Sequence, residues 1–513
     1  MTIALRASGY ALFICSLLAQ CSPGTTRDGS IPHFSEIPLG FAHRHDEDKS
    51  LSFVASAVID LRGDGHPFIF VGGGYAQEDA LFAFRNGAFV NVTGETGFAK
   101  GATEASMGAA AVDLDGDGMQ DLIVARETGL YAYLNHHGQL IGSRLNVEFP
   151  DATPLSITAG DVNRDGYVDL YISTYIKNSL YKGASIFNDP SYGPVSLMLL
   201  GGPGASFRDA TMETGLYRKH NTFTALLVDL DNDGWLDLAV AQDTGTVKLY
   251  RNVKGRFEEQ PDPTGFGYPM GIAVGDFHGT GRMDLFFSNS GSTFPDFMIR
   301  GDLRDRQKLE KRWILLRNDG NFKFTNVAQE WGIADLEFSW GAVAADFDLD
   351  GFEDLVVAEN FSASPVMRLL NNPGRFLVQR NRRFIPAEKQ AGVANPYHTI
   401  SPIVVDVNGD GRPDLIWINL GAPARAFING STGNSLTVAL PEKAVGSIVK
   451  VTLNDGRVVT RQFVIGQGLC SDQSHDLIFG LGKSRPISLE VRFPSGEVRV
   501  IPAAQSNTRI KVD

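Results

Sequence analysis

The chain has 513 residues, of which 43% are hydrophobic and 20% charged, a composition typical of globular proteins that excludes a disordered or fibrous chain. Its formal net charge of −13 argues against general binding to nucleic acids or to anionic membrane surfaces. The length allows two or more domains, and the 56 glycines predict many tight turns between short strands.

The first residues have the features of an export signal. Arg6 precedes an apolar stretch from Tyr10 to Leu18, which is too short to span a bilayer. The following Leu-Ala-Gln-Cys is close to the lipobox of bacterial lipoproteins, with Gln20 where a small residue is usual. We predict a lipoprotein signal over residues 1–21 and lipidation of Cys21, with plain secretion or an uncleaved segment as alternatives. The protein is then exported and anchored to an outer membrane or cell surface, or otherwise periplasmic or secreted.

The cysteines predict a mature fold without disulfides. Only Cys15, Cys21 and Cys470 occur, and Cys15 lies inside the predicted signal. If Cys21 is lipidated, Cys470 has no partner. Another kind of cross-link would then have to hold the loops of this exported protein together.

Residues 22–48 are interpreted as an N-terminal linker that contains one possible strand. Residues 33–41 (HFSEIPLGF) resemble a strand element that recurs later in the chain, although they are two residues shorter. The chain contains repeats, described below, and the last of them lacks this strand element. We therefore predict that the N-terminal strand completes the last repeat and closes a ring.

An acidic motif recurs between apolar runs from residue 113 onwards, with the pattern D-x-[DN]-x-D-G-x-x-D. When the first Asp is counted as position 1, candidate ligands stand at positions 1, 3, 5 and 9, and glycine stands at position 6. Each of five complete copies is named here by its first residue. The candidate ligands are Asp113, Asp115, Asp117 and Asp121; Asp161, Asn163, Asp165 and Asp169; Asp229, Asp231, Asp233 and Asp237; Asp346, Asp348, Asp350 and Asp354; and Asp406, Asn408, Asp410 and Asp414.

Two further copies are incomplete. The loop at Asp60 has Arg62 at position 3, and the loop at Asp276 has His278 there. The seven copies are spaced by 47 to 70 residues. The sequence leaves open whether the two incomplete loops bind metal.

The segments between the loops predict β-structure. An aromatic residue followed eight positions later by glycine recurs, as in Phe89 with Gly97 and Phe324 with Gly332, within stretches that alternate apolar and polar residues. Runs such as LYAYLN, VKLYRN and ILLRN add another strand to each unit. About four short strands per repeat are typical of a propeller blade. We predict an all-β fold with a seven-bladed β-propeller over residues 49–430.

The acidic loops favour calcium as the cofactor, at about five sites. Ca²⁺ takes six to eight oxygen ligands, and alternating carboxylates in a tight loop can point inward together. Position 12 is apolar in all five loops and the continuations are strand-like, so EF-hands are excluded. The alternative is a set of Asx-turns that happen to be acidic.

Electrostatic repulsion also predicts bound cations. The five complete loops hold 18 aspartates, whose carboxylates repel one another when they lie a few ångströms apart. Five Ca²⁺ ions would change the formal charge from −13 to −3. Metal binding would then be coupled to folding and would replace the missing disulfides.

These motifs resemble the FG-GAP or VCBS repeats of integrin-α-type propellers. The last residues, including the segments FGLG (479–482) and FPSG (493–496), resemble the ASPIC/UnbV domain that follows such propellers in a cartilage-acidic-protein-like bacterial family. Phe493 stands where a Trp is usual. The resemblance implies a small β-sandwich or barrel-like domain over residues 431–513, and it implies architecture and calcium rather than an activity.

The sequence favours a non-catalytic protein. It contains no G-x-S-x-G, phosphate-binding loop or HExxH motif. We expect a binding, adhesion or scaffold protein whose propeller face takes a protein or glycan partner; the alternative is a calcium-dependent lyase or dehydratase that acts on carbohydrate. Two insertions, residues 181–206 and 292–312, are candidate binding loops. Gly466–Gly468 is interpreted as a turn, and the oligomeric state is not predicted.

Overall fold

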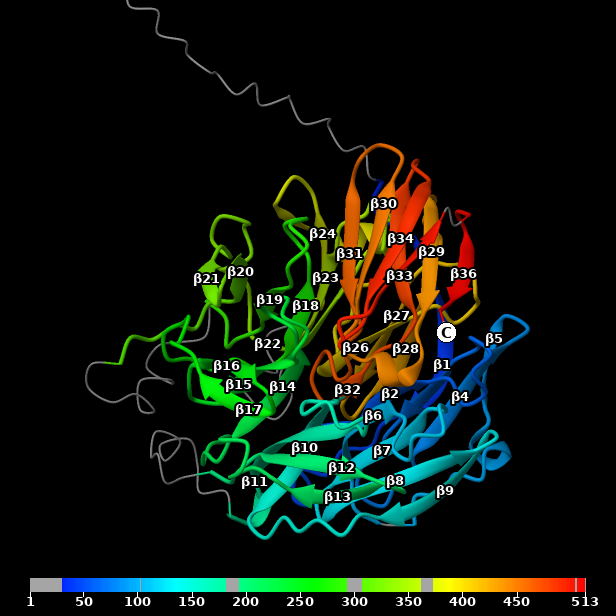
Figure 1. Cartoon of the computed structure of the whole chain (residues 1–513). Coiled ribbons are helices and arrows are strands. Elements are labelled where there is room, and N and C mark those ends of the chain that lie inside the picture. The colour runs from blue at the N-terminus through cyan, green and yellow to red at the C-terminus, as the bar shows by residue number, and fades with distance from the viewer. Residues whose placement is uncertain are drawn as a thin grey trace, which may run out of the picture.

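The structure is a computed structural model that describes residues 30–101, 103–180, 193–292, 307–360, 372–502 and 505–512. In these residues seven sheets surround a common centre, and two further sheets stand on one side of them (Figure 1). The prediction of an all-β propeller with a small β domain is confirmed.

Each of the seven sheets has four strands paired antiparallel from the inside outwards, and in the last sheet the outermost strand comes from the N-terminus. The sheets are, in chain order, β2 (Ser56–Ile59), β3 (Phe68–Val71), β4 (Ala80–Arg85) and β5 (Ala88–Asn91); β6 (Ser106–Val112), β7 (Asp121–Arg126), β8 (Gly129–His136) and β9 (Gln139–Arg144); β10 (Ala152–Gly160), β11 (Asp169–Ile176), β12 (Leu197–Gly202) and β13 (Ser206–Asp209); β14 (Thr222–Val228), β15 (Asp237–Gln242), β16 (Val247–Val253) and β17 (Arg256–Glu259); β18 (Ile272–Gly275), β19 (Asp284–Phe287), β20 (Ile314–Gly320) and β21 (Lys323–Asn326); β22 (Ser339–Ala345), β23 (Asp354–Glu359), β24 (Arg375–Gln379) and β25 (Phe384–Pro386); and β26 (Thr399–Val405), β27 (Asp414–Asn419), β28 (Pro423–Asn429) and β1 (Phe34–Ala42). The first sheet also includes a fifth strand, β32 (Ser471–Asp472), which pairs parallel with β2.

The N-terminal strand belongs to the sheet of the last repeat. β1 pairs antiparallel with β28, and Phe34 lies opposite Asn429. The first strands of neighbouring sheets contact one another in chain order, and β26 contacts β2. The sheets therefore form a closed ring. The predicted number of seven blades stays a prediction, because parts of the chain lie outside the described residues.

Each acidic loop joins the first strand of a sheet to the second. In the five complete loops the second strand begins at the aspartate of position 9, as β7 does at Asp121. The glycine at position 6 has a left-handed backbone, with φ of 90° at Gly118 and 96° at Gly351, which residues with a Cβ atom rarely adopt. Most residues of the first strands are buried, and many of them are small, such as Ala109 to Ala111 in β6.

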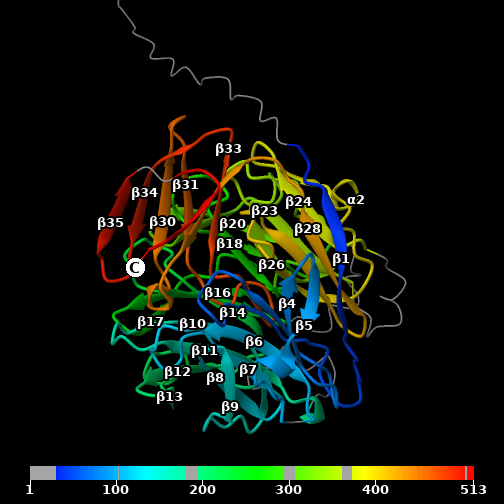
Figure 2. The same ribbon diagram turned by 90° about the vertical axis from the view of Figure 1, so that its right-hand side faces the viewer.

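The C-terminal residues form a two-sheet domain on the side of the ring that carries the acidic loops (Figure 2). One sheet contains β29 (Asn434–Ala439), β33 (Leu477–Gly482) and β36 (Thr508–Lys511), and the other contains β30 (Ile448–Leu453), β31 (Val458–Gln462), β34 (Pro486–Arg492) and β35 (Val498–Pro502). Side chains of both sheets share one apolar cluster with residues of β6, β7, β10 and β11. The cores of the domain and the ring are therefore continuous.

Helical segments are short in the described part of the chain. They are η1 (Thr93–Glu95), η2 (Asn178–Leu180), α2 (Glu388–Ala391) and η6 (Glu442–Ala444). In the residues that the structure describes, no helix combines the length and hydropathy that a bilayer span requires.

Candidate metal centres

The backbone of each complete loop folds around the carboxylate at position 1. In the Asp113 loop, Oδ2 of Asp113 accepts the N–H of Gly118 at 3.0 Å. The other four loops repeat this bond at 2.7 to 2.9 Å. The first aspartate therefore sets the turn as well as offering an oxygen to an ion.

The carboxylate at position 5 caps the second half of the loop. Oδ1 of Asp117 accepts the N–H of Met119 at 2.8 Å, and the equivalent bond occurs in the other four loops. Several of these side chains are in exposed positions, including Asp117 and Asp165. The second carboxylate oxygen of Asp165 accepts from Asn163 Nδ2 at 2.8 Å, and that of Asp410 accepts from Asn408 Nδ2 at 2.8 Å.

The aspartate at position 9 is buried and ties the loop to the third strand of its sheet. In Asp121, Oδ2 accepts the N–H of Leu114 at 2.8 Å and Oδ1 accepts that of Asn135 at 2.7 Å. Burial raises the pKa of Asp121 to about 7 and that of Asp169 to about 7, while backbone N–H groups partly oppose the shift. A nearby cation would favour the charged form.

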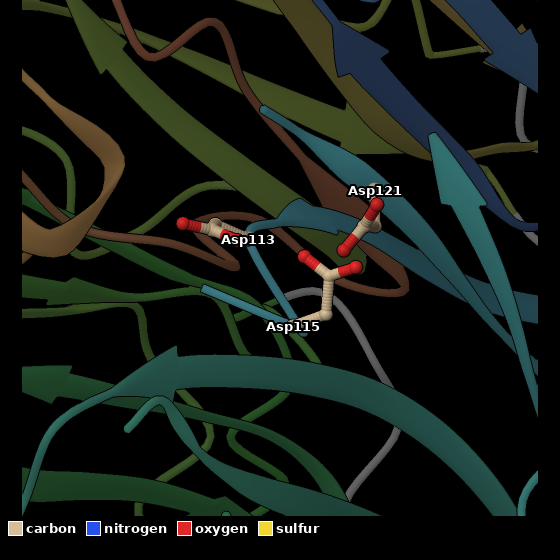
Figure 3. A group of neighbouring side chains, drawn as sticks. All are labelled: Asp113, Asp115 and Asp121. Atoms are coloured by element: carbon tan, nitrogen blue, oxygen red, sulfur yellow. The ribbon is translucent and has the colours of Figure 1, made fainter. Parts of the chain in front are cut away.

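Three loops bring carboxylates of positions 1, 3 and 9 together. One oxygen from each of Asp113, Asp115 and Asp121 lies within 4.8 Å of the others (Figure 3). The same holds for Asp229, Asp231 and Asp237, and for Asp346, Asp348 and Asp354. In the Asp161 and Asp406 loops position 3 is an asparagine, which offers an amide oxygen instead. The position-5 aspartates are not members of these three groups.

The donor set fits a hard cation. Each group offers carboxylate oxygens, the ligands that Ca²⁺ prefers, whereas zinc and copper sites favour histidine and cysteine. The loops that hold them are built with the same internal hydrogen bonds. That these residues hold calcium stays a prediction.

In the two incomplete loops a nitrogen-bearing side chain lies in the loop or against it. His278 Nδ1 donates to Asp284, the position-9 aspartate, at 2.8 Å. At the Asp60 loop, the guanidinium of Arg509 from β36 lies against Gly65, 2.9 Å from where a Cβ would stand. Arg509 also forms an ion pair with Asp476 at 2.6 Å.

An asparagine at the end of the third strand links neighbouring repeats, and sequence reasoning missed it. Asn252 Nδ2 donates to Leu236 O of its own loop and to Val162 O of the preceding repeat, both at 2.9 Å. Asn135, Asn318 and Asn429 make the same two bonds, and Gln379 makes the bond to the preceding repeat. The recurring final Asn of LYAYLN, VKLYRN and ILLRN was the available indication.

Replacing this asparagine should destabilise the ring. Asn252→Ala leaves two buried carbonyls without their donor, so we expect a loss of about 2 kcal/mol in the free energy of unfolding. Urea unfolding at saturating calcium measures this loss in the free energy of unfolding. Asn146→Ala changes an exposed asparagine and serves as the control. Equal midpoints for the two variants would show that the link between repeats contributes nothing.

A segment of the C-terminal domain occupies the centre of the ring, where the sequence had suggested only a turn. We call residues 465–473 the plug; it includes β32 (Ser471–Asp472), which pairs with β2. Gln467 Oε1 accepts the N–H of Val274 at 3.0 Å and that of Ala344 at 3.2 Å. Further bonds join the plug to β2, β6, β10, β18 and β26. It therefore closes the ring centre at this side.

A buried ion network lies beside the plug. Glu442 accepts from His475 Nδ1 at 2.9 Å, and Asp472 lies 3.4 Å from Nε2. Burial alone would lower the pKa of His475, but these two carboxylates outweigh it and raise the pKa to about 10. The imidazole is therefore charged at neutral pH.

Three predicted features fall wholly or partly outside the described residues. The predicted lipidation site Cys21 lies in the undescribed part, as do residues 181–192 and 293–306 of the two insertions. Cys470, the free cysteine of the described part, is buried in the plug.

Comparisons with known proteins identify both parts of the chain. An FG-GAP-like repeat model matches residues 60–124, 113–172 and 229–287, and an ASPIC and UnbV model matches residues 438–513. Cartilage acidic protein 1 of Homo sapiens is 25% identical over 454 residues, which cover 79% of this chain and 63% of the human protein. The Mus musculus protein is 22% identical with 79% and 64% coverage. The chain thus spans less than two thirds of these relatives.

Among solved structures, the Agrocybe aegerita lectin that recognises non-reducing terminal N-acetylglucosamine is 16% identical, with a TM-score of 0.41 over 73% of this chain and 94% of that chain. BBS1N in complex with ARL6DN is 11% identical, with a TM-score of 0.43 over 76% of this chain and 97% of that chain. The chain is thus a β-propeller with segments that match FG-GAP-like repeats and a C-terminal segment that matches the ASPIC and UnbV domain, and it is similar to cartilage acidic protein 1 over 79% of its length.

Proposed function

We propose that this protein is an exported, calcium-binding propeller that acts as a non-catalytic binding or scaffold protein for a protein or glycan partner. The observation that carries the calcium assignment is the gathering of three carboxylates within 4.8 Å at the same loop positions in three separate repeats. Unneutralised carboxylates at that spacing repel strongly. The Asp161 and Asp406 loops share the backbone arrangement and are included in the proposal.

Metal content of the purified protein tests the calcium assignment. We expect about five Ca²⁺ ions per chain by elemental analysis after dialysis against calcium, since five loops carry complete ligand sets. Asp115→Asn removes one carboxylate of a three-carboxylate group, so calorimetric titration should show one weakened site. Asp319→Asn, an exposed aspartate paired with Arg317, is the control. Protein without calcium at millimolar concentrations would contradict the assignment.

The partner surface is proposed on the side of the ring opposite the C-terminal domain. The C-terminal domain covers part of the loop side, and the plug fills the ring centre there. Glycan and peptide arrays probed with and without calcium would test for a partner. Turnover of polyuronides by the purified protein would favour the carbohydrate-active alternative instead.

A lipid anchor at Cys21 is part of the proposal and rests on the lipobox-like residues 18–21. Mass spectrometry of the mature N-terminus tests it. Diacylglyceryl-modified Cys21 in membrane fractions is the expected result, and Cys21→Ser should release the protein. An unmodified mature chain would contradict the anchor but leave the calcium assignment intact.

A further inference from the structure

The Asp346 loop differs from the other metal loops in how deeply it is buried. Asp346, Asp348 and Asp354 are 2%, 8% and 1% exposed, and these three carboxylates form one of the close groups. In the Asp113 loop the carboxylates at positions 1 and 3 are partly exposed, and in the Asp161 loop so are Asp161 and Asn163. The Asp229 loop is intermediate: Asp229 is 1% exposed and Asp231 is partly exposed, and Arg492 of the C-terminal domain donates to Asn232 O at 2.9 Å. An ion in the Asp346 loop would therefore have less access to water.

The cover over this loop comes from the C-terminal domain. Gly482 N donates to Leu349 O at 2.7 Å, and Arg457 Nη1 donates to Asp350 O at 2.7 Å. Gly480 of β33 lies so close that a Cβ there would stand 1.9 Å from Asp346 Oδ2. Because Gly480 has no Cβ atom, the backbone of β33 can lie directly against the carboxylate of Asp346.

The charges at this loop require compensation that the protein supplies only in part. Four aspartates of the loop and Glu353 lie together, and the arginines that form ion pairs with them are Arg380 and Arg461. Arg461 divides its charge between Glu353, at 2.5 Å, and Asp346, at 3.9 Å. A net negative charge beneath the docked domain is costly unless a cation joins it.

We propose that the ion of the Asp346 loop is enclosed beneath the C-terminal domain and leaves only when that domain lifts from the ring. This inference rests on the proposed calcium function. It assigns one of the calcium sites a separate role, because the ring and the C-terminal domain would share its ion. Binding of the ion and docking of the domain then stabilise each other by the same free energy. The more exposed loops exchange their ions without domain movement.

Exchange of ⁴⁵Ca²⁺ tests the proposal on the full mature chain. The protein is loaded with ⁴⁵Ca²⁺, diluted into excess EGTA and passed over a desalting column at increasing times. We expect most ions to leave in a fast phase and about one ion per chain to leave at least tenfold more slowly, because its release needs a sub-global opening. Asp346→Asn should abolish the slow phase, and Asp161→Asn, the matched change in a more exposed loop, should leave it intact.

A second variant loosens the cover without touching a ligand. Arg457→Gln removes the guanidinium that donates to Asp350 O. We expect the slow phase to become about tenfold faster at unchanged calcium content, since the charge-assisted hydrogen bond from the domain to the loop is lost. Arg499→Gln, in an exposed pair with Glu497 on the same domain, should leave the rate unchanged.

The outcomes separate this inference from the proposed function. Calcium that binds at the expected content but leaves in one fast phase overturns the enclosed site and leaves the function standing. A slow phase that survives Asp346→Asn, or that Arg457→Gln does not accelerate, also overturns it. Protein that binds no calcium overturns both.

Discussion

Removal of calcium with EGTA lowers the melting temperature of the mature protein by about 10 °C, if the metal loops stabilise the ring as their geometry indicates. A calcium site present only in the folded chain contributes about 2.7 kcal/mol of stability when the free calcium concentration is a hundred times its dissociation constant. Unfolding of a chain this long has an entropy near 1 kcal/mol per kelvin. Differential scanning calorimetry with calcium and with EGTA measures the shift.

The calcium effect should depend on pH in a defined direction. Burial raises the pKa of Asp121 and Asp169 to about 7 and that of Asp229 to about 6, above the usual aspartate value of about 3.9. The metal-free folded chain therefore binds more protons than the unfolded chain between about pH 4 and 7, and it gains stability as the pH falls through that window. Calcium binding requires ionised carboxylates, so the affinity for calcium falls as the pH falls through the same window. The difference between the two melting temperatures should be largest near pH 8 and smaller at pH 5.

Magnesium provides the control for charge alone. It demands octahedral geometry and retains its water, so it should restore less of the lost melting temperature than calcium does. Identical melting curves in calcium and in EGTA at pH 8 would refute the stabilising role of the loops. A shift that grew at pH 5 would contradict the carboxylate explanation.

The acidic loops and the N-terminal strand could be predicted because their information is local or repeated. The spacing of Asp113, Asp115 and Asp121 within nine residues fixes which side chains can meet. The aromatic residue followed eight positions later by glycine recurs in earlier repeats but is missing from the last one, and residues 33–41 resemble it. In the structure β1 pairs with β28 in the sheet of the last repeat. These features need no knowledge of distant contacts.

The plug could not be predicted because its partners are far apart in the chain. Asp472 bonds to Ala111, 361 residues away, and Gln467 bonds to two different sheets. Gly466 and Gly468 have left-handed backbones, with φ of 93° and 117°, which in sequence indicates only a turn. The buried position of Asp346 could not be predicted either, since it depends on where β33 lies.

Asp472→Ala should be among the most destabilising single changes in the described part of the chain. Asp472 is 1% exposed, and its carboxylate accepts the N–H of Ala111 at 2.9 Å and that of Gly466 at 2.8 Å. It also faces the charged His475. Removing it leaves unpaired these two donors and the N–H of Gln473, which it accepts at 3.0 Å, and weakens the compensation of a buried cation. The change should cost about 4 kcal/mol of the free energy of unfolding.

Urea unfolding at saturating calcium measures this loss while it keeps the metal contribution constant. Glu497→Ala, which removes an exposed partner of Arg499, should cost less than about 1 kcal/mol and is the control. Because one apolar cluster runs through the C-terminal domain and the ring, both variants should unfold in a single transition. An Asp472→Ala midpoint equal to that of the control would show that the plug occupies the ring centre without stabilising the ring. A separate early transition of the C-terminal domain would show that the continuous core does not couple the two parts.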